Sequence, residues 1–394
     1  MAFLDETGLA ELWRLNKERT YAKDESLSHT TRVVLGISDG ATPDDAFLRL
    51  ALGADKKAMY IRVTTPKGIP LAGLTINGVT DVNGKTAVTD SDGGVVSIAP
   101  NDTSAISITS PYIDLVNYSG SVTADPNQVV TNITIVLQPT AAKVTTWDTS
   151  VSGLKFSPDV VKYDVCCVGG GGAGGVGHRV YDDGDPTYYG GTGGAGGDIV
   201  SLLNQTHTFG SVFSCTIGAG GARSGDYQFN VSGNSGGATT CMLNGSTILT
   251  ANGGAGGPKS ASSGSVAGAT SSQNGGNGGN SGSGAYRAGT AGTAGGHLFG
   301  DSSEMQVCGG GGGGGMSESS SPAGGSPYGG KGSYYTMKTV NNSHVEYYMR
   351  GDATGPGGGG GGAGNTTNIY GNQAYIGNGA GYKGLFALRW RYSA

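Results

Sequence analysis

The chain has 394 residues, a formal net charge of −5 and only 13% charged residues. This length accommodates two or three domains, and the sparse, slightly acidic charge leaves no basic face for a nucleic-acid backbone. Glycine is the abnormal component, since it contributes 78 residues and all but 12 of them lie from Cys166 onwards. We therefore expect a glycine-rich carboxy-terminal half and no nucleic-acid partner.

The amino-terminal segment, residues 1–58, opens with apolar side chains at helical spacing. These are Phe3, Leu4, Leu9, Leu12 and Trp13, and they predict a short amphipathic helix. Little else in the segment can cover this apolar face. We therefore assign the segment to attachment and oligomerisation, with folding back onto the next domain as the alternative.

The same amino terminus carries acidic residues, and no basic region is followed by an apolar one. We expect no secretory signal peptide. Apolar runs also stay well below the ~18 residues that span a bilayer, so we expect no membrane insertion.

Residues 59–140 alternate short β-prone stretches with turn signals such as Asn77-Gly78, Asn83-Gly84 and Asp92-Gly93. This spacing predicts an antiparallel β-sandwich, followed by a linker at 141–157. The stretch from Gly68 to Val96 resembles immunoglobulin-like and transthyretin-like modules of cell-surface and tail-fibre proteins. That resemblance implies a spacer and no chemistry.

From residue 158 to 394, short apolar strands run directly into glycine runs. The first predicted strand, Val160–Val168, leads into Gly169–Gly175, and the chain ends on an alternating strand from Gly384 to Tyr392. Similar units begin with predicted strands at Phe213–Ile217, Thr247–Thr250 and Met305–Cys308.

Glycine runs are costly to order, so a flexible linker is the default interpretation. Here the runs alternate with strands and are rich in alanine near them, which favours a folded domain. Threefold polyproline-II geometry leaves every backbone N–H and C=O pointing outward, and glycine lets such helices approach closely enough to bond one another. We predict a mainly β chain whose carboxy-terminal domain packs polyglycine II helices beside strands.

This region resembles the glycine-rich tail-fibre tips and receptor-binding adhesins of tailed phages and phage-like particles. The motifs that carry the resemblance are Tyr163–Val168 with its glycine run, Thr216–Gly221, Ala251–Gly257 and Leu388–Tyr392. The resemblance implies a virion tail protein made in the host cytoplasm, bound to other tail or baseplate proteins, that recognises a host surface glycan or surface protein. It also favours a homo-oligomer, specifically a trimer, although the glycine domain could close within one chain.

Tyrosines between the glycine runs are the candidate receptor contacts, because tyrosine offers a large, rigid surface with a polar tip. We select Tyr181, Tyr188, Tyr189, Tyr227, Tyr286, Tyr334, Tyr335, Tyr347, Tyr348 and Tyr370. The alternative role is to cover the glycine core, which we expect for about half of the tyrosines.

No motif in the sequence predicts catalysis, a cofactor or a metal. Gly169, Gly171 and Gly174 match a dinucleotide fingerprint, but no helix signal follows them. The aspartates from Asp182 to Asp185 lack the spacing of a calcium loop and fit a solvated turn. The five cysteines have no zinc spacing, so we expect buried apolar residues.

We therefore expect a non-enzymatic adhesin. Two alternatives remain from the sequence: a structural tail or baseplate component without receptor contact, and a host extracellular glycine-rich matrix protein.

Overall fold

A computed structural model of the chain describes residues 57–81, 84–99, 103–125, 130–182, 185–224, 230–259, 265–282, 289–314, 322–332, 334–340, 343–349, 351–363 and 378–392. The chain divides into two units, Met1–Ala141 with Phe156–Asp159, and Ala142–Lys155 with Val160–Ala394. Within the described residues the regular elements are β-strands, and the single helix is the short 3-10 helix η1, Leu298–Gly300. The predicted amino-terminal helix, with Phe3, Leu4, Leu9, Leu12 and Trp13, lies outside them.

The first unit is built from two β-sheets. One has the strand order β4-β1-β7, formed by Gly94–Ala99, Lys57–Thr64 and Val130–Val136. The other has the order β3-β2-β5-β6, formed by Thr86–Val88, Thr75–Thr80, Thr103–Ile108 and Tyr118–Thr123. The predicted sandwich is thus present. It is not wholly antiparallel, because β1 and β7 pair in parallel.

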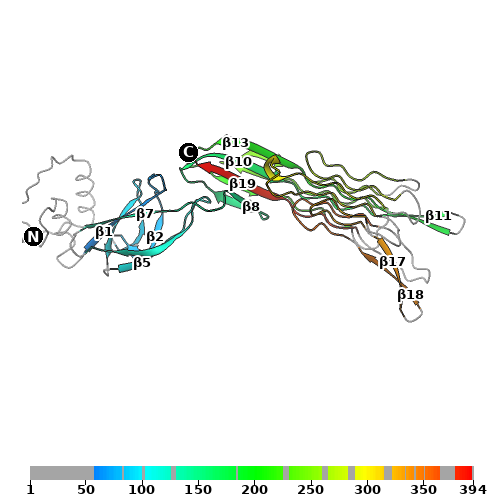
Figure 1. Cartoon of the computed structure of the whole chain (residues 1–394), viewed down its shortest axis with the longest axis horizontal. Coiled ribbons are helices and arrows are strands. Elements are labelled where there is room, and N and C mark those ends of the chain that lie inside the picture. Colours follow the sequence, from blue (N-terminus) through cyan, green and yellow to red (C-terminus); the bar gives the residue numbers. More distant parts are fainter. Residues whose placement is uncertain are drawn as a thin grey trace, which may run out of the picture. The chain divides into compact units, whose positions relative to one another are not determined.

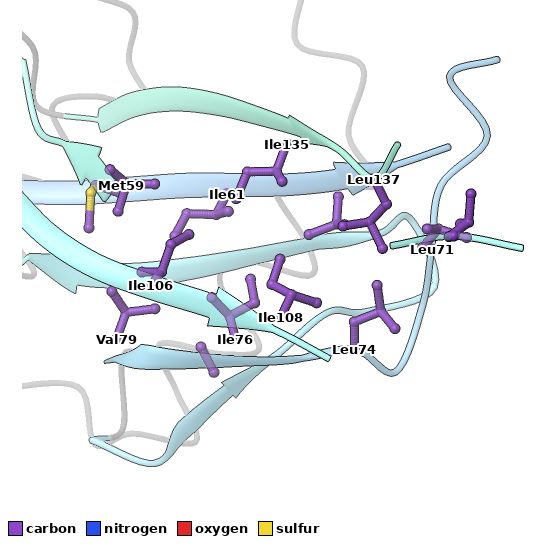
Figure 2. Packing of buried hydrophobic residues seen from close by; sticks show 14 of the residues in the cluster. Met59, Ile61, Leu71, Leu74, Ile76, Val79, Ile106, Ile108, Ile135 and Leu137 are labelled. Atoms are coloured by element: carbon purple, nitrogen blue, oxygen red, sulfur yellow. The ribbon is translucent and has the colours of Figure 1, made fainter. Parts of the chain in front are cut away.

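Both sheets of this sandwich contribute to one apolar core (Figure 2). In β5 the burial alternates strictly, so that Ile106 and Ile108 point inward while their neighbours face solvent. They share the cluster with Ile61 of β1, Ile76 of β2 and Ile135 of β7. Each such side chain stabilises the fold by about 1.5–3 kcal/mol.

Residues 141–157 are not the linker that we predicted. They contain β8, Val144–Trp147, and β9, Val151–Leu154, and both strands belong to sheets of the second unit. Residues Phe156–Asp159 belong to the first unit, where the Ser157 hydroxyl donates to the Asp114 carboxylate at 2.5 Å. The linker interpretation failed because the short strands gain their pairing partners from distant sequence.

The second unit places two four-stranded sheets beside the glycine runs. The first has the order β13-β10-β19-β8. In it, β13 is Ile199–Thr206, β10 is Val160–Val168 and β19 is Leu385–Tyr392. The second has the order β16-β15-β14-β9, with Ser246–Ala251, Thr239–Leu243 and Phe213–Thr216. The predicted strands at 160–168 and at the end of the chain are confirmed, and they pair with each other. The predicted strand Met305–Cys308 is wrong, because this segment makes only one isolated bridge, at Gln306.

All five cysteines are free and buried, as predicted. They lie on both faces of β10. Cys166 joins an apolar cluster with Val168, Phe299 and Cys308. On the other face, contacts with the thiols of Cys215 and Cys241, together with burial, raise the pKa of the Cys167 thiol.

The first glycine run, residues 169–176, donates hydrogen bonds to three other segments in rotation. Its N–H groups at Gly169, Gly172 and Gly175 reach one segment, through the carbonyls of Asp198, Ala195 and Thr192 at 3.0, 2.9 and 2.8 Å. The next three N–H groups in register, Gly170, Ala173 and Val176, reach a second segment at Gly237, Asn234 and Val231. Gly171 and Gly174 reach a third segment at Tyr382 and Gly379. Every third residue therefore bonds to the same neighbour.

Carbonyl groups of the same run accept hydrogen bonds from three further segments. Gly221, Gly254 and Gly360 donate to Gly171, Gly170 and Gly172 at 2.7, 2.8 and 2.8 Å. Residues 169–177 are buried, and each of their N–H groups donates to a backbone carbonyl of another segment. The runs lie side by side in Figure 1, between β10, β13, β19 and β8 on one side and β11, β17 and β18 on the other.

Glycine is required in these runs because neighbouring backbones approach too closely for a side chain. A Cβ atom on Gly171 would lie 1.9 Å from the Gly358 carbonyl oxygen. Backbone on both sides is held by hydrogen bonds and cannot move aside cheaply.

The last strand is held by a buried carboxylate. Asp164 on β10 is fully buried and accepts from the Arg389 Nε at 2.7 Å and the Arg391 Nη2 at 2.6 Å. Burial opposes ionisation of Asp164, but the Asn204 N–H and the two guanidinium groups outweigh it and lower the carboxyl pKa. Ionised Asp164 therefore ties β10 to β19.

We predict that Gly171→Ala lowers the free energy of unfolding by about 3 kcal/mol or more, because the new methyl group overlaps a fixed carbonyl. Gly237→Ala is the matched control, since its Cβ would meet its nearest atom, the Ala219 nitrogen, only at 3.0 Å. It should lose about 1 kcal/mol. Urea denaturation of the full chain measures both values. Equal losses would contradict the close-approach argument.

We predict that Asp164→Asn destabilises the second unit by about 3 kcal/mol at pH 7, because it leaves two guanidinium groups without their buried anion. The folded pKa of Asp164 lies below the unfolded value of about 3.9, so its stabilising effect is present above that pH and fades as pH falls through the folded pKa. The gap between wild type and variant should shrink below about pH 4. Asp148→Asn, which removes an exposed pair with Lys383, should change stability little. A gap that does not depend on pH would contradict this assignment.

Candidate functional site

The glycine runs alternate in direction, so their connections emerge at two opposite ends of the domain. The run 169–177 leads away from β10 and reaches the hairpin of β11, His178–Asp182, and β12, Asp185–Tyr189. The next run, 190–198, returns to β13, and its bonds to the first run proceed in antiparallel order. Figure 1 accordingly places β11 far from β10 and β13. We name the end that carries β11 the loop end, and the other the strand end.

Residues that flank several other connections also lie at the loop end. The N–H groups of Gly177 and Gly191, on either side of the first hairpin, both donate to the Ala363 carbonyl, at 3.1 and 2.7 Å. Ala363 immediately precedes residues 364–377. The Val176 N–H donates to Val231, which follows residues 225–229, and the Gly314 N–H donates to Gly191 just before residues 315–321. Flanking residues of connections far apart in sequence therefore lie at the same end.

A second hairpin also belongs to the loop end. It pairs β17, Tyr334–Val340, with β18, Ser343–Met349. The run before it is joined to the scaffold by the Gly330 N–H, which donates to the Gly359 carbonyl at 2.9 Å. Figure 1 shows β17 and β18 on the side of the glycine runs that also carries β11.

The loop end carries those of the selected tyrosines that the structure describes. Tyr181 lies in β11, and Tyr188 and Tyr189 lie in β12. The second hairpin holds four more in its strands, namely Tyr334, Tyr335, Tyr347 and Tyr348, with Tyr335 opposite Tyr348. Tyr227, Tyr286 and Tyr370 lie outside the described residues.

One tyrosine between the runs has the alternative role of covering the core. Tyr328 packs against the cluster that contains Cys166 and Phe299, and the Cβ position of Gly355 lies against its ring. Two further tyrosines are structural: Tyr163 meets Phe213 edge-on at 5.0 Å between centroids, and Tyr112 lies in the core of the sandwich.

The dinucleotide-like spacing at Gly169, Gly171 and Gly174 has a purely structural use. All three N–H groups donate to carbonyls of neighbouring segments, so none is left to bind a pyrophosphate. No helix follows this motif in the described residues.

Two features are absent from the described residues. No group of three or more His, Cys, Asp or Glu side chains is arranged to hold a metal ion there. In the same residues no helix has the length and apolarity needed to cross a membrane.

Sequence reasoning missed a feature at the strand end. A cavity of about 720 Å³ lies beside β13 and η1, and its lining includes Gln273, Asn274 and Phe299. Asn274 and Phe299 both have left-handed backbones, with φ of 56° and 58°. No residue pattern signals this site, since it depends on conformations that neither residue type usually adopts.

The core of the second unit consists of glycine runs joined by backbone hydrogen bonds, with strands at one end. This arrangement defines a glycine-rich domain. A sequence model of the glycine-rich domain family matches residues 148–391. The chain therefore belongs to this family, as its glycine content predicted.

Other comparisons add little. No curated protein matches the chain. Among solved structures, a variant of the major pilin subunit of Bacillus cereus is similar at 8% identity and a TM-score of 0.19, over 82% of this chain and 95% of that one. A likeness at that TM-score carries no argument about fold or function.

We predict that the first hairpin is dispensable for folding. Replacing residues 178–190 by a short Gly/Ser turn should change the free energy of unfolding by less than about 1 kcal/mol, because Gly177 and Gly191 are already held at one carbonyl. Urea denaturation of the full chain provides the measurement. A loss as large as that of Gly171→Ala would mean that the hairpin is part of the scaffold.

Proposed function

We propose that this chain is a non-enzymatic adhesin, a tail-fibre tip of a phage or phage-like particle, and that its loop end binds a receptor on the host surface. The observation that carries the proposal is the collection of tyrosine-bearing segments at one end of a backbone-bonded frame. The receptor would be a surface glycan or a surface protein, since tyrosine can contribute to recognition of either.

We also infer that the glycine runs are polyglycine II helices. Such a helix has three residues per turn and no internal hydrogen bonds, so each third N–H points to the same side. The rotation of hydrogen bonds along 169–176 through three acceptor segments has this period. Bonding in six directions would make the frame stiff, and a stiff frame lowers the entropy lost when its loops bind a receptor.

Loop variation is compatible with this frame. The residues that bracket several of the connections, such as Gly177, Gly191 and Ala363, are fixed by backbone hydrogen bonds, which depend little on side-chain identity. Connecting segments can therefore change in length and composition while the scaffold stays the same. A receptor-binding protein benefits from this separation, because recognition can change without a new fold.

The remaining parts of the chain fit the same proposal. The sandwich of the first unit would be an immunoglobulin-like or transthyretin-like spacer. Residues 1–58 would attach the protein to other tail or baseplate proteins and assemble a homo-oligomer, with a trimer favoured. The protein would be made in the host cytoplasm and would reside in the virion tail, without a cofactor.

Binding of labelled full-length protein to a panel of bacterial strains tests the proposal. Three variants carry alanine at the tyrosines of the first hairpin (Tyr181, Tyr188 and Tyr189), at those of the second hairpin (Tyr334, Tyr335, Tyr347 and Tyr348), or at Tyr370. We expect at least one of them to reduce binding to a recognised strain by about tenfold or more, as the loss of central aromatic contacts does.

Phe209→Ala is the control, because Phe209 is 57% exposed and closely follows β13, away from the loop end. It should bind like the wild type. If every loop variant also binds like the wild type, the loop end is not the receptor-binding surface. If the wild-type protein binds no strain, the structural tail component becomes the better interpretation.

A further inference from the structure

The cavity at the strand end lies apart from the proposed receptor-binding loops. Its floor is the start of β13, from Ile199 to Ser201. One wall is the turn at 273–275, and the other is formed by residues 294–297 with part of η1 and Ser302. Its volume of about 720 Å³ would hold a ligand of one or two ring units.

The first wall is fixed by a buried carboxylate. Asp198 is 1% exposed and accepts from the Ser272 hydroxyl at 2.5 Å, the Ser272 N–H at 3.1 Å and the Gln273 N–H at 2.9 Å. The Gln273 carbonyl in turn accepts from the Ile199 N–H at 3.0 Å. This network fixes the backbone of the turn. The side chains of Gln273 and Asn274 are exposed, and the Asn274 amide lies 3.5 Å from the Ile199 carbonyl oxygen.

The second wall is fixed by contacts of η1 and its flanking residues. The Gln306 side-chain amide donates to the Gly295 carbonyl at 2.7 Å, and the His297 Nδ1 lies 2.8 Å from the Glu304 carbonyl oxygen. Phe299 is held beneath the Arg389 guanidinium, whose central carbon lies 4.6 Å from the ring centroid. Both walls are thus set before any ligand arrives.

Two of the left-handed non-glycine residues of the chain line this cavity. Asn274 and Phe299, one from each wall, adopt the left-handed conformation that a bulky aromatic residue rarely accepts. Strain of this kind persists only where the surroundings impose it, and it gathers at ligand-binding sites.

The described lining is rich in hydrogen-bonding groups, and His297 is its one titratable side chain. No Asp, Glu, Lys or Arg is among the described residues that line the cavity. The Gln273 amide and the Ser302 hydroxyl are exposed residues of the lining, and each can both donate and accept. Ile199 and Val200 supply apolar surface below them.

The charged side chains next to the cavity are paired with one another. Arg389 is engaged by Asp164, Asp301 and Glu304, at 2.7, 3.0 and 3.3 Å. It is therefore not free to recruit a phosphate or carboxylate ligand. The Ile199 N–H is also already bonded, to the Gln273 carbonyl.

We propose that the strand-end cavity binds a neutral saccharide unit. A sugar presents paired hydroxyl groups that match the amide and hydroxyl groups of Gln273, Asn274 and Ser302, and a C–H face that matches the apolar floor. This site is separate from the tyrosine loops and would hold its sugar whether or not those loops recognise a receptor.

Saturation-transfer NMR on the full chain tests the proposal, with the methyl glycosides of glucose, galactose, mannose and N-acetylglucosamine as probes. We expect transfer to at least one of them at millimolar concentration. Gln273→Ala should weaken that binding at least tenfold, and Ser302→Trp, which places a ring in the open mouth, should abolish it. Comparison with a tetrasaccharide of the same sugar separates a polysaccharide chain, bound more tightly, from a free sugar, bound equally well.

Gln205→Ala is the matched control, because this amide lies on the same strand and donates to the Leu203 carbonyl, outside the cavity. It should bind sugar like the wild type, as should the alanine variants of the tyrosine loops. Thermal unfolding of each variant confirms that it is folded. The proposal is overturned if no glycoside shows transfer, if Ser302→Trp binds like the wild type, or if glucuronate binds better than glucose.

Discussion

Lateral hydrogen bonds between backbones hold the glycine-rich domain together. In the run at 169–176, each N–H donates to a carbonyl of one of three neighbouring segments. Carbonyls of the run accept hydrogen bonds from three further segments. Such bonding requires neighbouring chains to lie closer than any side chain permits, as the 1.9 Å between a Cβ on Gly171 and the Gly358 oxygen illustrates. The glycine content of the chain is therefore a packing requirement. Ordering so much glycine is entropically costly, and the satisfied backbone groups offset that cost collectively.

The strands give this arrangement a beginning and an end. β10 leads directly into the first run, and β19 follows the last one and pairs with β10, so the two extremes of the domain meet in one sheet. Conventional side-chain packing is concentrated here, between Tyr163 and Phe213 and around the buried cysteines. The Asp164 carboxylate adds a charged tie between the same two strands. Closure of the domain thus depends on long-range contacts that join residues more than 200 positions apart.

The two ends of the runs are suited to different tasks. At the loop end, fixed glycines bracket segments whose length and composition the scaffold does not constrain, which favours variable recognition. At the strand end, Asp198, η1 and the Arg389 network build a cavity with fixed walls, which favours one defined small ligand. A protein with both sites would combine a variable receptor-binding surface at the loop end with a constant ligand site at the strand end. The two proposals stand on different residues and can fail separately.

Local patterns were sufficient for much of this protein. Alternation and turn residues located the sandwich, β10 and β19, and the glycine content indicated the domain whose family the chain belongs to. The tyrosine-bearing segments were also visible, because composition alone separates them from the runs. Tertiary structure decided which segments are neighbours. It set the pairing of β8 with β19 and of β9 with β14, the parallel β1–β7 pair, and the common end of the loop-flanking residues. It also decided the strand-end cavity, whose walls depend on left-handed backbones at Asn274 and Phe299. The physical reason is that a glycine run carries no side-chain signature of its neighbour, so identical runs are distinguished only by the register of backbone hydrogen bonds in the folded domain.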